Sequence, residues 1–218
     1  MHLGTTKMDY KLLDTGYTTH MERVLFKGGK FSSVEIPANA FLLEHSKGLM
    51  LFDTGYSDLF AAVTQKYPYN IYGKITPTYN IHSVKDQLEE KNISADDISH
   101  IIISHYHADH ICGLRDFPKA TFISTQQAYN SIQNETGWSA LKKGFIPQLL
   151  PANFKKRLQL LNAPIDLPSQ LQPFTQGYDI LGDASLLAVP LPGHAQGQIG
   201  LFFDNTFLIA DAAWKKQN

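Results

Sequence analysis

Residues 101–110 read Ile-Ile-Ile-Ser-His-Tyr-His-Ala-Asp-His. The three β-branched residues predict a buried strand, and the polar residues that follow predict that it ends in a loop. Three imidazoles and one carboxylate then lie within six residues, a group that is hard to accommodate beside a core unless a cation organises it. Imidazole nitrogen and carboxylate oxygen suit Zn²⁺ and, less tightly, Mn²⁺ or Fe²⁺. The stretch therefore predicts a metal site of the hydrolytic kind.

The spacing within this stretch predicts two neighbouring ion positions. His105 and His107 are two residues apart, so in an extended segment both side chains point to the same side. Asp109 and His110 come where the chain turns, with Gly113 shortly after, and can face a second point nearby. A single histidine in such a loop is most often an ordinary surface residue. Four potential ligands directly after a buried strand favour a metal site over that interpretation.

Length and composition predict one globular domain, residues 1–218. The chain is 43% hydrophobic and 18% charged, which is ordinary for a domain of this size. A net charge of −1 with scattered Lys and Arg argues against nucleic-acid binding. No apolar stretch reaches membrane-spanning length and the N-terminus lacks the apolar core of a secretory signal, so we expect no membrane association and a cytoplasmic protein. Cys112 is the single cysteine, which excludes an internal disulfide, and we expect it to be a small packed residue.

Hydrophobic patterning predicts an α/β protein in which strands and helices alternate. Ser83 followed by Asp86 predicts a helix after Ile81, a second short helix is expected after Ser94, and residues 124–135 are expected to be helical. Five prolines between residues 136 and 180 predict short helices and loops there rather than core strands. Strands are predicted at about 20–27, 38–45, 49–53, 100–104, 120–124, 185–190, 199–203 and 206–210.

Three more polar residues stand at predicted strand ends: Asp53 in Leu-Phe-Asp-Thr-Gly, His194 in Pro-Gly-His, and Asp211 in Leu-Ile-Ala-Asp. Each alone is most simply a turn residue. Together with the histidine stretch they supply what a dinuclear site needs. The predicted ligands are His105, His107 and His194 for one ion, Asp109 and His110 for the second, and Asp211 bridging both.

This combination resembles the metallo-β-lactamase-fold superfamily over nearly the whole chain. The similarity lies in His-x-His-x-Asp-His at 105–110, Asp-Thr-Gly at 53–55, Gly-His at 193–194 and the strand-terminal Asp211. The resemblance implies a four-layer αββα sandwich with two divalent ions, zinc or else manganese or iron, at the rim between two central sheets. It also implies that Asp53 lies around the ions and orients their ligands instead of binding them.

Within the superfamily, the sequence is most similar to the N-acyl homoserine lactonase-like branch. The Asp-His pair at 109–110 resembles lactonases, glyoxalase II and phosphodiesterases, whereas zinc β-lactamases usually carry arginine or another residue at the last position. Pro-Gly-His at 192–194 and Ile-Ala-Asp-Ala at 209–212 are similar to the lactonases. The resemblance therefore implies a hydrolase whose partner is a small-molecule lactone.

Two positions depart from the family pattern. Dinuclear members usually supply a further histidine to the second ion, well beyond the bridging aspartate, but this sequence stops at Asn218, seven residues after Asp211. Three expectations follow: a truncated chain that lacks the C-terminal elements of the fold, an incomplete second site, or a ligand from a neighbouring chain. Trp214 stands where quorum-signal lactonases tend to carry a tyrosine whose hydroxyl approaches the substrate carbonyl, and an indole N–H sits differently.

The predicted reaction is metal-assisted hydrolysis of an ester-like bond, with Asp109 carrying the proton to the leaving alkoxide. Tyr106 alternates with the histidines on either side and is expected to pack away from the ions. Trp138 and Phe145, in the subregion 136–180, are predicted to wall an apolar substrate pocket, together with Phe154 and Phe174. A hydrophobic subregion without a ligand is equally consistent with the sequence.

Three alternatives to a lactonase stay open. One is a thioesterase of the glyoxalase II kind. Another is an oxidoreductase that holds a single iron and oxidises persulfides, which an incomplete second site would favour. The third is an inactive truncated form with low metal occupancy and poor stability, because metal binding and folding are coupled. Assembly as a homodimer also stays open.

Overall fold

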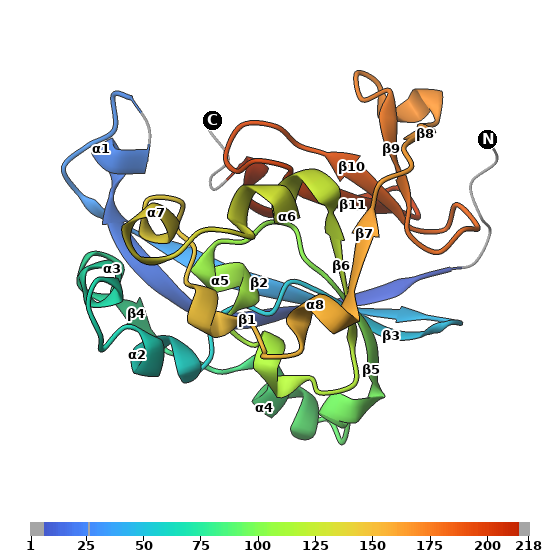
Figure 1. Cartoon of the computed structure of the whole chain (residues 1–218). Coiled ribbons are helices and arrows are strands. Elements are labelled where there is room, and N and C mark those ends of the chain that lie inside the picture. Colours follow the sequence, from blue (N-terminus) through green and yellow to red (C-terminus); the bar gives the residue numbers. More distant parts are fainter. Residues whose placement is uncertain (1–6, 26, 214–218) are drawn as a thin grey trace.

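The fold is built on two β-sheets (Figure 1). The computed structural model describes residues 7–25 and 27–213. The larger sheet has the order β4-β1-β2-β3-β5-β6-β7, antiparallel from β4 to β3 and parallel from β3 to β7. Its strands are β1 (Asp9–Met21), β2 (Ser33–His45), β3 (Gly48–Phe52), β4 (Thr78–Tyr79), β5 (Ile98–Ile102), β6 (Thr121–Thr125) and β7 (Leu158–Leu161).

The smaller sheet is antiparallel, with the order β12-β11-β10-β9-β8. Its strands are β8 (Ile165–Asp166), β9 (Gln176–Asp179), β10 (Leu187–Pro190), β11 (Ile199–Phe203) and β12 (Thr206–Leu208). Connections of two to nine residues join consecutive strands of this sheet, which antiparallel neighbours allow.

Alternation along the strands decides which layer each side chain joins. In β3, Met50 and Phe52 enter the cluster between the two sheets, while Leu51, between them in sequence, faces the helices. In β11, Leu201 enters the inter-sheet cluster, whereas Phe202 lies in a third cluster on the far face of the smaller sheet. Both faces of these strands are therefore apolar, and so they read as continuous hydrophobic runs in the sequence.

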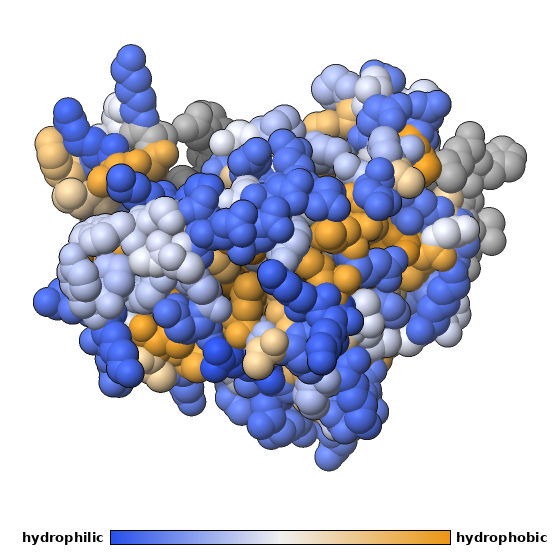
Figure 2. Space-filling view, in the orientation of Figure 1, coloured by the Kyte–Doolittle hydropathy of each residue, from blue (hydrophilic) through white to orange (hydrophobic). Residues whose placement is uncertain are grey.

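Helices cover the outer face of the larger sheet, where their apolar side chains share one core cluster with the strands (Figure 1). In the same orientation, hydrophilic residues cover much of the surface and hydrophobic residues lie between them (Figure 2). The helices on this face are α2 (Leu59–Val63), α3 (Tyr69–Ile75), α4 (Val84–Glu89), α5 (Ala108–Ile111), α6 (Gln126–Ile132), α7 (Gly137–Leu141) and α8 (Phe154–Arg157); α1 (Glu22–Leu25) follows β1. The far face of the smaller sheet is covered by the chain around the 3₁₀-helix Ser169–Leu171. None of the helices in the described ranges has the length and apolar character needed to cross a bilayer.

Most predicted elements are confirmed, and side-chain capping explains why the starts of the helices could be predicted from the sequence. The Ser83 side chain accepts a hydrogen bond from Asp86 N at the start of α4, and Thr125 does the same for Ala128 N at the start of α6. Ser94 opens the predicted short helix after it, a 3₁₀-helix, through a capping box. The predicted α/β class and the two packed sheets are likewise confirmed.

Two element predictions are wrong. A strand was expected at 20–27, but β1 begins at Asp9 and ends at Met21, and α1 follows it directly. The first part of β1 alternates poorly because Tyr10 and Leu12 are exposed, so pairing with β2, rather than burial, fixes it as a strand. The subregion 136–180 contains three strands besides its helices, and β7 joins the larger sheet beside β6.

Candidate metal centre

The histidine stretch leaves the larger sheet at the end of β5 and turns into α5. β5 ends at Ile102, Ser104 lies in a bend, and His107 occupies the N-cap position of α5 with extended backbone angles (φ −68°, ψ 153°). Asp109 and His110 then lie in the single turn of this four-residue helix. This change from strand to helix directs the first two histidines and the following Asp-His pair to adjoining points, as the spacing predicted.

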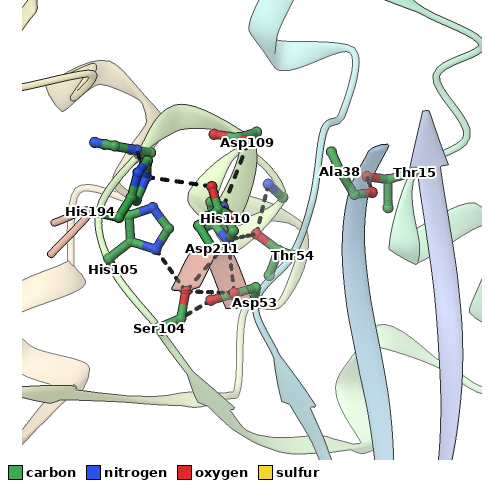
Figure 3. Close-up of polar contacts among 12 residues, drawn as sticks. Thr15, Ala38, Asp53, Thr54, Ser104, His105, Asp109, His110, His194 and Asp211 are labelled. Carbon is green, nitrogen blue, oxygen red and sulfur yellow. Dashed lines mark hydrogen bonds and ion pairs between the residues drawn. The ribbon is translucent and has the colours of Figure 1, made fainter. Parts of the chain in front are cut away.

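Chain segments far apart in sequence complete the site. His194 lies in the loop after β10, and Asp211 follows β12, so the smaller sheet brings both residues to the end of β5. Figure 3 shows their side chains directed toward the histidines. Two groups of potential ligand atoms result, each with all its atoms within 4.8 Å of one another. One consists of His105, His107, His194 and Asp211, and the other of Asp109, His110 and Asp211.

Asp211 stands between the two groups through its two oxygens. Its Oδ2 lies 3.4 Å from His194 Nε2, and its Oδ1 lies 3.4 Å from His110 Nε2. On the first side, His194 Nε2 also lies 2.8 Å from His107 Nδ1. On the second, His110 Nε2 lies 3.6 Å from Asp109 Oδ2. A carboxylate with one oxygen toward each group has the placement expected of a residue that bridges two cations.

Asp53 holds the histidines from behind (Figure 3). Its Oδ2 accepts hydrogen bonds from His110 Nδ1 and from the Ser104 hydroxyl, both at 2.7 Å, and its Oδ1 accepts one from Ser104 N at 2.7 Å. Since the Ser104 hydroxyl donates its proton to Asp53, Ser104 Oγ can only accept the hydrogen bond of 2.9 Å from His105 Nδ1. Both imidazoles therefore carry a proton on Nδ1 and direct Nε2 toward the site.

The backbone around Asp53 explains how a carboxylate comes to lie there. Asp53 directly follows β3 in the left-handed region (φ 62°), a conformation that aspartate tolerates better than most residues, and its N–H donates to Ile102 O in β5. Thr54 then ties this turn to α5, because its N–H and its hydroxyl both donate to His110 O. The Asp-Thr-Gly turn thus positions the helix as well as the carboxylate.

Burial keeps two of the imidazoles neutral. It holds the pKa of His105 well below the usual range, and the nearby His110, His107 and His194 rings lower it further. Burial also lowers the pKa of His107 to about 3, again with help from His194 and His110. Neutral imidazole is the form that binds a metal ion, so both residues are ready as ligands at neutral pH.

The other half of the site has the opposite electrostatics. Burial raises the pKa of Asp109; His110 opposes this rise, and the carboxylates of Asp211 and Asp53 add to it. Burial alone would lower the pKa of His110, but Asp109, Asp211 and Asp53 around it hold that pKa well above the usual range. Three carboxylates close together favour the protonated form of a buried imidazole. A bound cation would stabilise the same negative charges.

The donor set fits one or two divalent cations. Nε2 of His105 and of His110 are both buried without a hydrogen-bond partner among residues 7–25 and 27–213. A buried polar atom left without a partner costs about 1–3 kcal/mol. Each of these two nitrogens belongs to one of the two ligand groups, so a cation in each group would satisfy both.

A cavity of about 210 Å³ opens onto the ligands, and its wall is largely apolar or aromatic. A second cavity, of about 520 Å³, adjoins it; the two share Tyr72, His107 and His194. The subregion 136–180 reaches this second cavity through Leu141–Gly144. Besides Tyr72 and the ligands, the first cavity is lined by Thr18, His20, Val24, Leu25, Ile36, Tyr56 and Thr76.

The residues predicted to wall the pocket lie elsewhere or outside the described ranges. Trp138 is half-exposed, and its indole N–H donates to the Tyr67 hydroxyl, while Phe145 is buried in the helix-side core; neither lines the two cavities at the ligands. Trp214 lies outside the described residues. A pocket role for these three side chains therefore stays a prediction.

Two neighbours of the ligands occupy the places expected of packing residues. Tyr106 is buried and packs edge-on against Phe145 and Phe154, as expected from its alternation with the histidines. Cys112 is fully buried 3.3 Å from the Ser57 hydroxyl and belongs to neither ligand group, and burial raises the pKa of its thiol to about 11. Its expected role as a small packed residue is confirmed.

Sequence reasoning missed Ser104, which links Asp53 to two histidines. Its only signal was a hydroxyl placed between the end of a buried strand and the first ligand. The contact depends on the left-handed turn at Asp53, which spacing along the chain does not reveal.

The sequence matches the family model of the metallo-beta-lactamase superfamily over residues 34–213. The chain belongs to this superfamily. Among curated members, it is similar to the N-acyl homoserine lactonase AttM of Azorhizobium caulinodans, with 28% identity over 196 residues, 86% of this chain and 67% of the relative. It is also similar to the metallo-hydrolase mfmC of Annulohypoxylon moriforme, with 24% identity over 198 residues, 88% of this chain and 51% of the relative. The chain thus spans between about half and two thirds of the length of these relatives.

Solved structures share the fold. A quorum-quenching N-acyl homoserine lactone lactonase superimposes with a TM-score of 0.63 at 17% identity, covering 93% of this chain and 69% of the other. The dizinc quorum-quenching lactonase AidC superimposes with a TM-score of 0.57 at 20% identity, covering 95% and 71%. The predicted superfamily and its two-sheet architecture are therefore confirmed.

Proposed function

We propose that this protein is a metal-dependent hydrolase that opens an ester-like bond, most readily that of a lactone. The observation that carries the proposal is the pair of ligand groups that meet at Asp211, with a buried imidazole nitrogen in each that has no hydrogen-bond partner among the described residues. A resemblance to N-acyl homoserine lactonases supports the lactone as the first substrate to test.

In this proposal, His105, His107, His194 and Asp211 hold one divalent ion, zinc or else manganese or iron. Asp109, His110 and Asp211 contribute to a second. Such ions supply Lewis acidity, which polarises a carbonyl oxygen and makes water a stronger nucleophile near neutral pH. Ser104 accepts from Nδ1 of His105 and Asp53 accepts from Nδ1 of His110, and these two hydrogen bonds would keep Nε2 of each ring directed at an ion.

Asp109 is the proposed proton carrier. Its side chain lines the smaller cavity, and burial followed by the neighbouring carboxylates raises its pKa toward the range where it can hold and release a proton. The alkoxide that leaves an opened lactone needs such a proton. The apolar wall of that cavity, with Val24, Leu25 and Ile36, suits an uncharged acyl group better than a phosphate.

The first test combines metal analysis with a hydrolysis screen. Protein purified without added metal is assayed for bound zinc, manganese and iron, then for ring opening of γ- and N-acyl homoserine lactones and for thioester hydrolysis. H107Q should lower metal content and abolish activity. The matched control is H82Q, because His82 is a surface histidine paired with Glu90 at 3.0 Å, and it should change neither.

Three results would contradict the proposal. A wild-type chain without bound metal would exclude the centre. Hydrolysis that is unchanged in H107Q would place the activity elsewhere. A single iron per chain, with oxygen consumption on a persulfide and no ring opening, would favour the oxidoreductase alternative instead.

A further inference from the structure

The C-terminal turn of α7 lies directly against one of the proposed ligands. Gly144 ends this turn, and its carbonyl accepts a hydrogen bond of 3.1 Å from Ala108 N, the residue that follows His107. A Cβ placed on Gly144 would lie 2.8 Å from Cδ2 of His107, 3.1 Å from its Nε2 and 3.3 Å from its Cγ. Real Cβ atoms essentially never approach another atom as closely as 2.8 Å, so a side chain here would force something to move.

The turn cannot move away from the ring. Phe145 N and Lys143 N both donate to Ala140 O, and Gly144 N donates to Leu141 O, which closes the end of α7. Ala140 and Phe145 on either side are fully or almost fully buried in the helix-side core. A closed turn anchored at both ends is rigid, because a packed interior resists displacement.

The ring is the part that would yield. His107 is only partly buried and faces both cavities, so space lies on its open side. A Cβ on Gly144 would meet the Cδ2 side of the imidazole, and the other side of the ring carries Nδ1, which lies 2.8 Å from His194 Nε2. Pressure from a Cβ would therefore shift Nδ1 away from its present relation to His194.

We propose that Gly144 is a positioning residue of the metal centre: its lack of a side chain lets the end of α7 support the Cδ2 edge of His107 and present Nδ1 as the ligating nitrogen. This rests on the proposed function, in which His107 is a ligand. It gives the subregion 136–180 a specific role, because its backbone sets the geometry of a ligand on the histidine stretch.

Gly144 also has a positive φ of +63°, so any substitution adds backbone strain, and the test must separate strain from contact. Gly137, at the other end of α7, supplies the matched control. Its φ is +53°, and a Cβ there would meet nothing within 4 Å. G137A therefore introduces the same kind of strain in the same helix without touching His107.

The experiment measures the Kd for Zn²⁺ and Co²⁺, by competition with a chromogenic chelator, together with the Tm of each metal-free protein. Both G144A and G137A should lower the Tm. Only G144A should weaken metal binding, by about ten-fold or more, the usual cost of disturbing a residue that orients a ligand. G137A should stay within about two-fold of the wild type.

G144N serves as the second variant, because asparagine tolerates positive φ but still carries a Cβ. It should fold more readily than G144A and lose a similar amount of metal affinity. Wild-type affinity in a folded G144A or G144N protein would overturn the role of Gly144, as would equal losses in G144A and G137A. A wild-type chain that bound neither ion would overturn the metal centre and this role together, and the wild-type titration alone reports that outcome.

Discussion

Replacing Asp53 with asparagine should damage both stability and metal binding, although the two side chains are nearly identical in shape. The Asp53 carboxylate is 2% exposed and accepts three hydrogen bonds of 2.7 Å, two from Ser104 and one from His110 Nδ1. An amide has one oxygen and one NH₂ group, so it cannot accept at both positions. Whichever way it turns, one or two of the three donors face another donor.

The magnitude follows from these contacts. If the amide oxygen keeps Ser104 N, the NH₂ group meets His110, which must give up its Nδ1 proton and keep any proton on Nε2, the nitrogen proposed to bind the ion. If it keeps His110, the NH₂ group meets the buried Ser104 N–H. A hydrogen bond to a charged group contributes about 1.5–3 kcal/mol, so we expect D53N to lower the free energy of unfolding of the metal-free protein by about 2–4 kcal/mol. Its Kd for zinc should rise by about 10- to 100-fold.

Urea unfolding with chelator present and zinc titration of the folded protein measure the two effects separately. D58N is the matched control, because Asp58 is exposed and its side chain makes no capping hydrogen bond at the start of α2. It should stay within about 0.5 kcal/mol of the wild type. A D53N protein as stable as D58N, with wild-type zinc affinity, would refute the hydrogen-bond reasoning.

Three further predictions concern the ions, the proton carrier and pH. Removing metal with a chelator should lower the apparent stability, by about 2.7 kcal/mol relative to protein with free metal at 100 times its Kd, and a Tm independent of metal would argue against a bound ion. D109N should slow the hydrolysis of alkyl esters and lactones far more than that of p-nitrophenyl esters, whose leaving group needs no proton; equal slowing would contradict proton transfer by Asp109. Because the pKa of His107 is lowered to about 3 in the folded protein, only the unfolded chain takes up this proton just below pH 6.5, and its contribution to stability falls as pH falls. Metal-free H107Q should therefore gain up to about 2 kcal/mol relative to the wild type between pH 7 and pH 5 in urea unfolding, and a constant difference would refute the assignment.

The parts of the fold that the sequence predicted are those with a local physical cause. Side-chain caps at Ser83, Ser94 and Thr125 start three helices, and each cap bonds within three residues of itself. Strands that are apolar on both faces, such as β5 and β11, appear as continuous hydrophobic runs. The first part of β1 gives no such signal. Pairing with β2 orders it, and its partners in β2 lie more than twenty residues away in sequence.

The sequence by itself determined which residue types make up the candidate metal centre and how most of them are spaced. The ligand types and the His-x-His-x-Asp-His spacing are properties of a few consecutive residues, and a strand that passes into a helix directs them to adjoining points. Only the tertiary structure decided how these residues are held. Packing of the two sheets brings Asp211 between the ligand groups, the left-handed turn at Asp53 brings a carboxylate to Ser104, and the end of α7 brings Gly144 against His107. These contacts join residues that lie tens of positions apart, so they exist only once burial of the shared core has fixed the layers relative to one another.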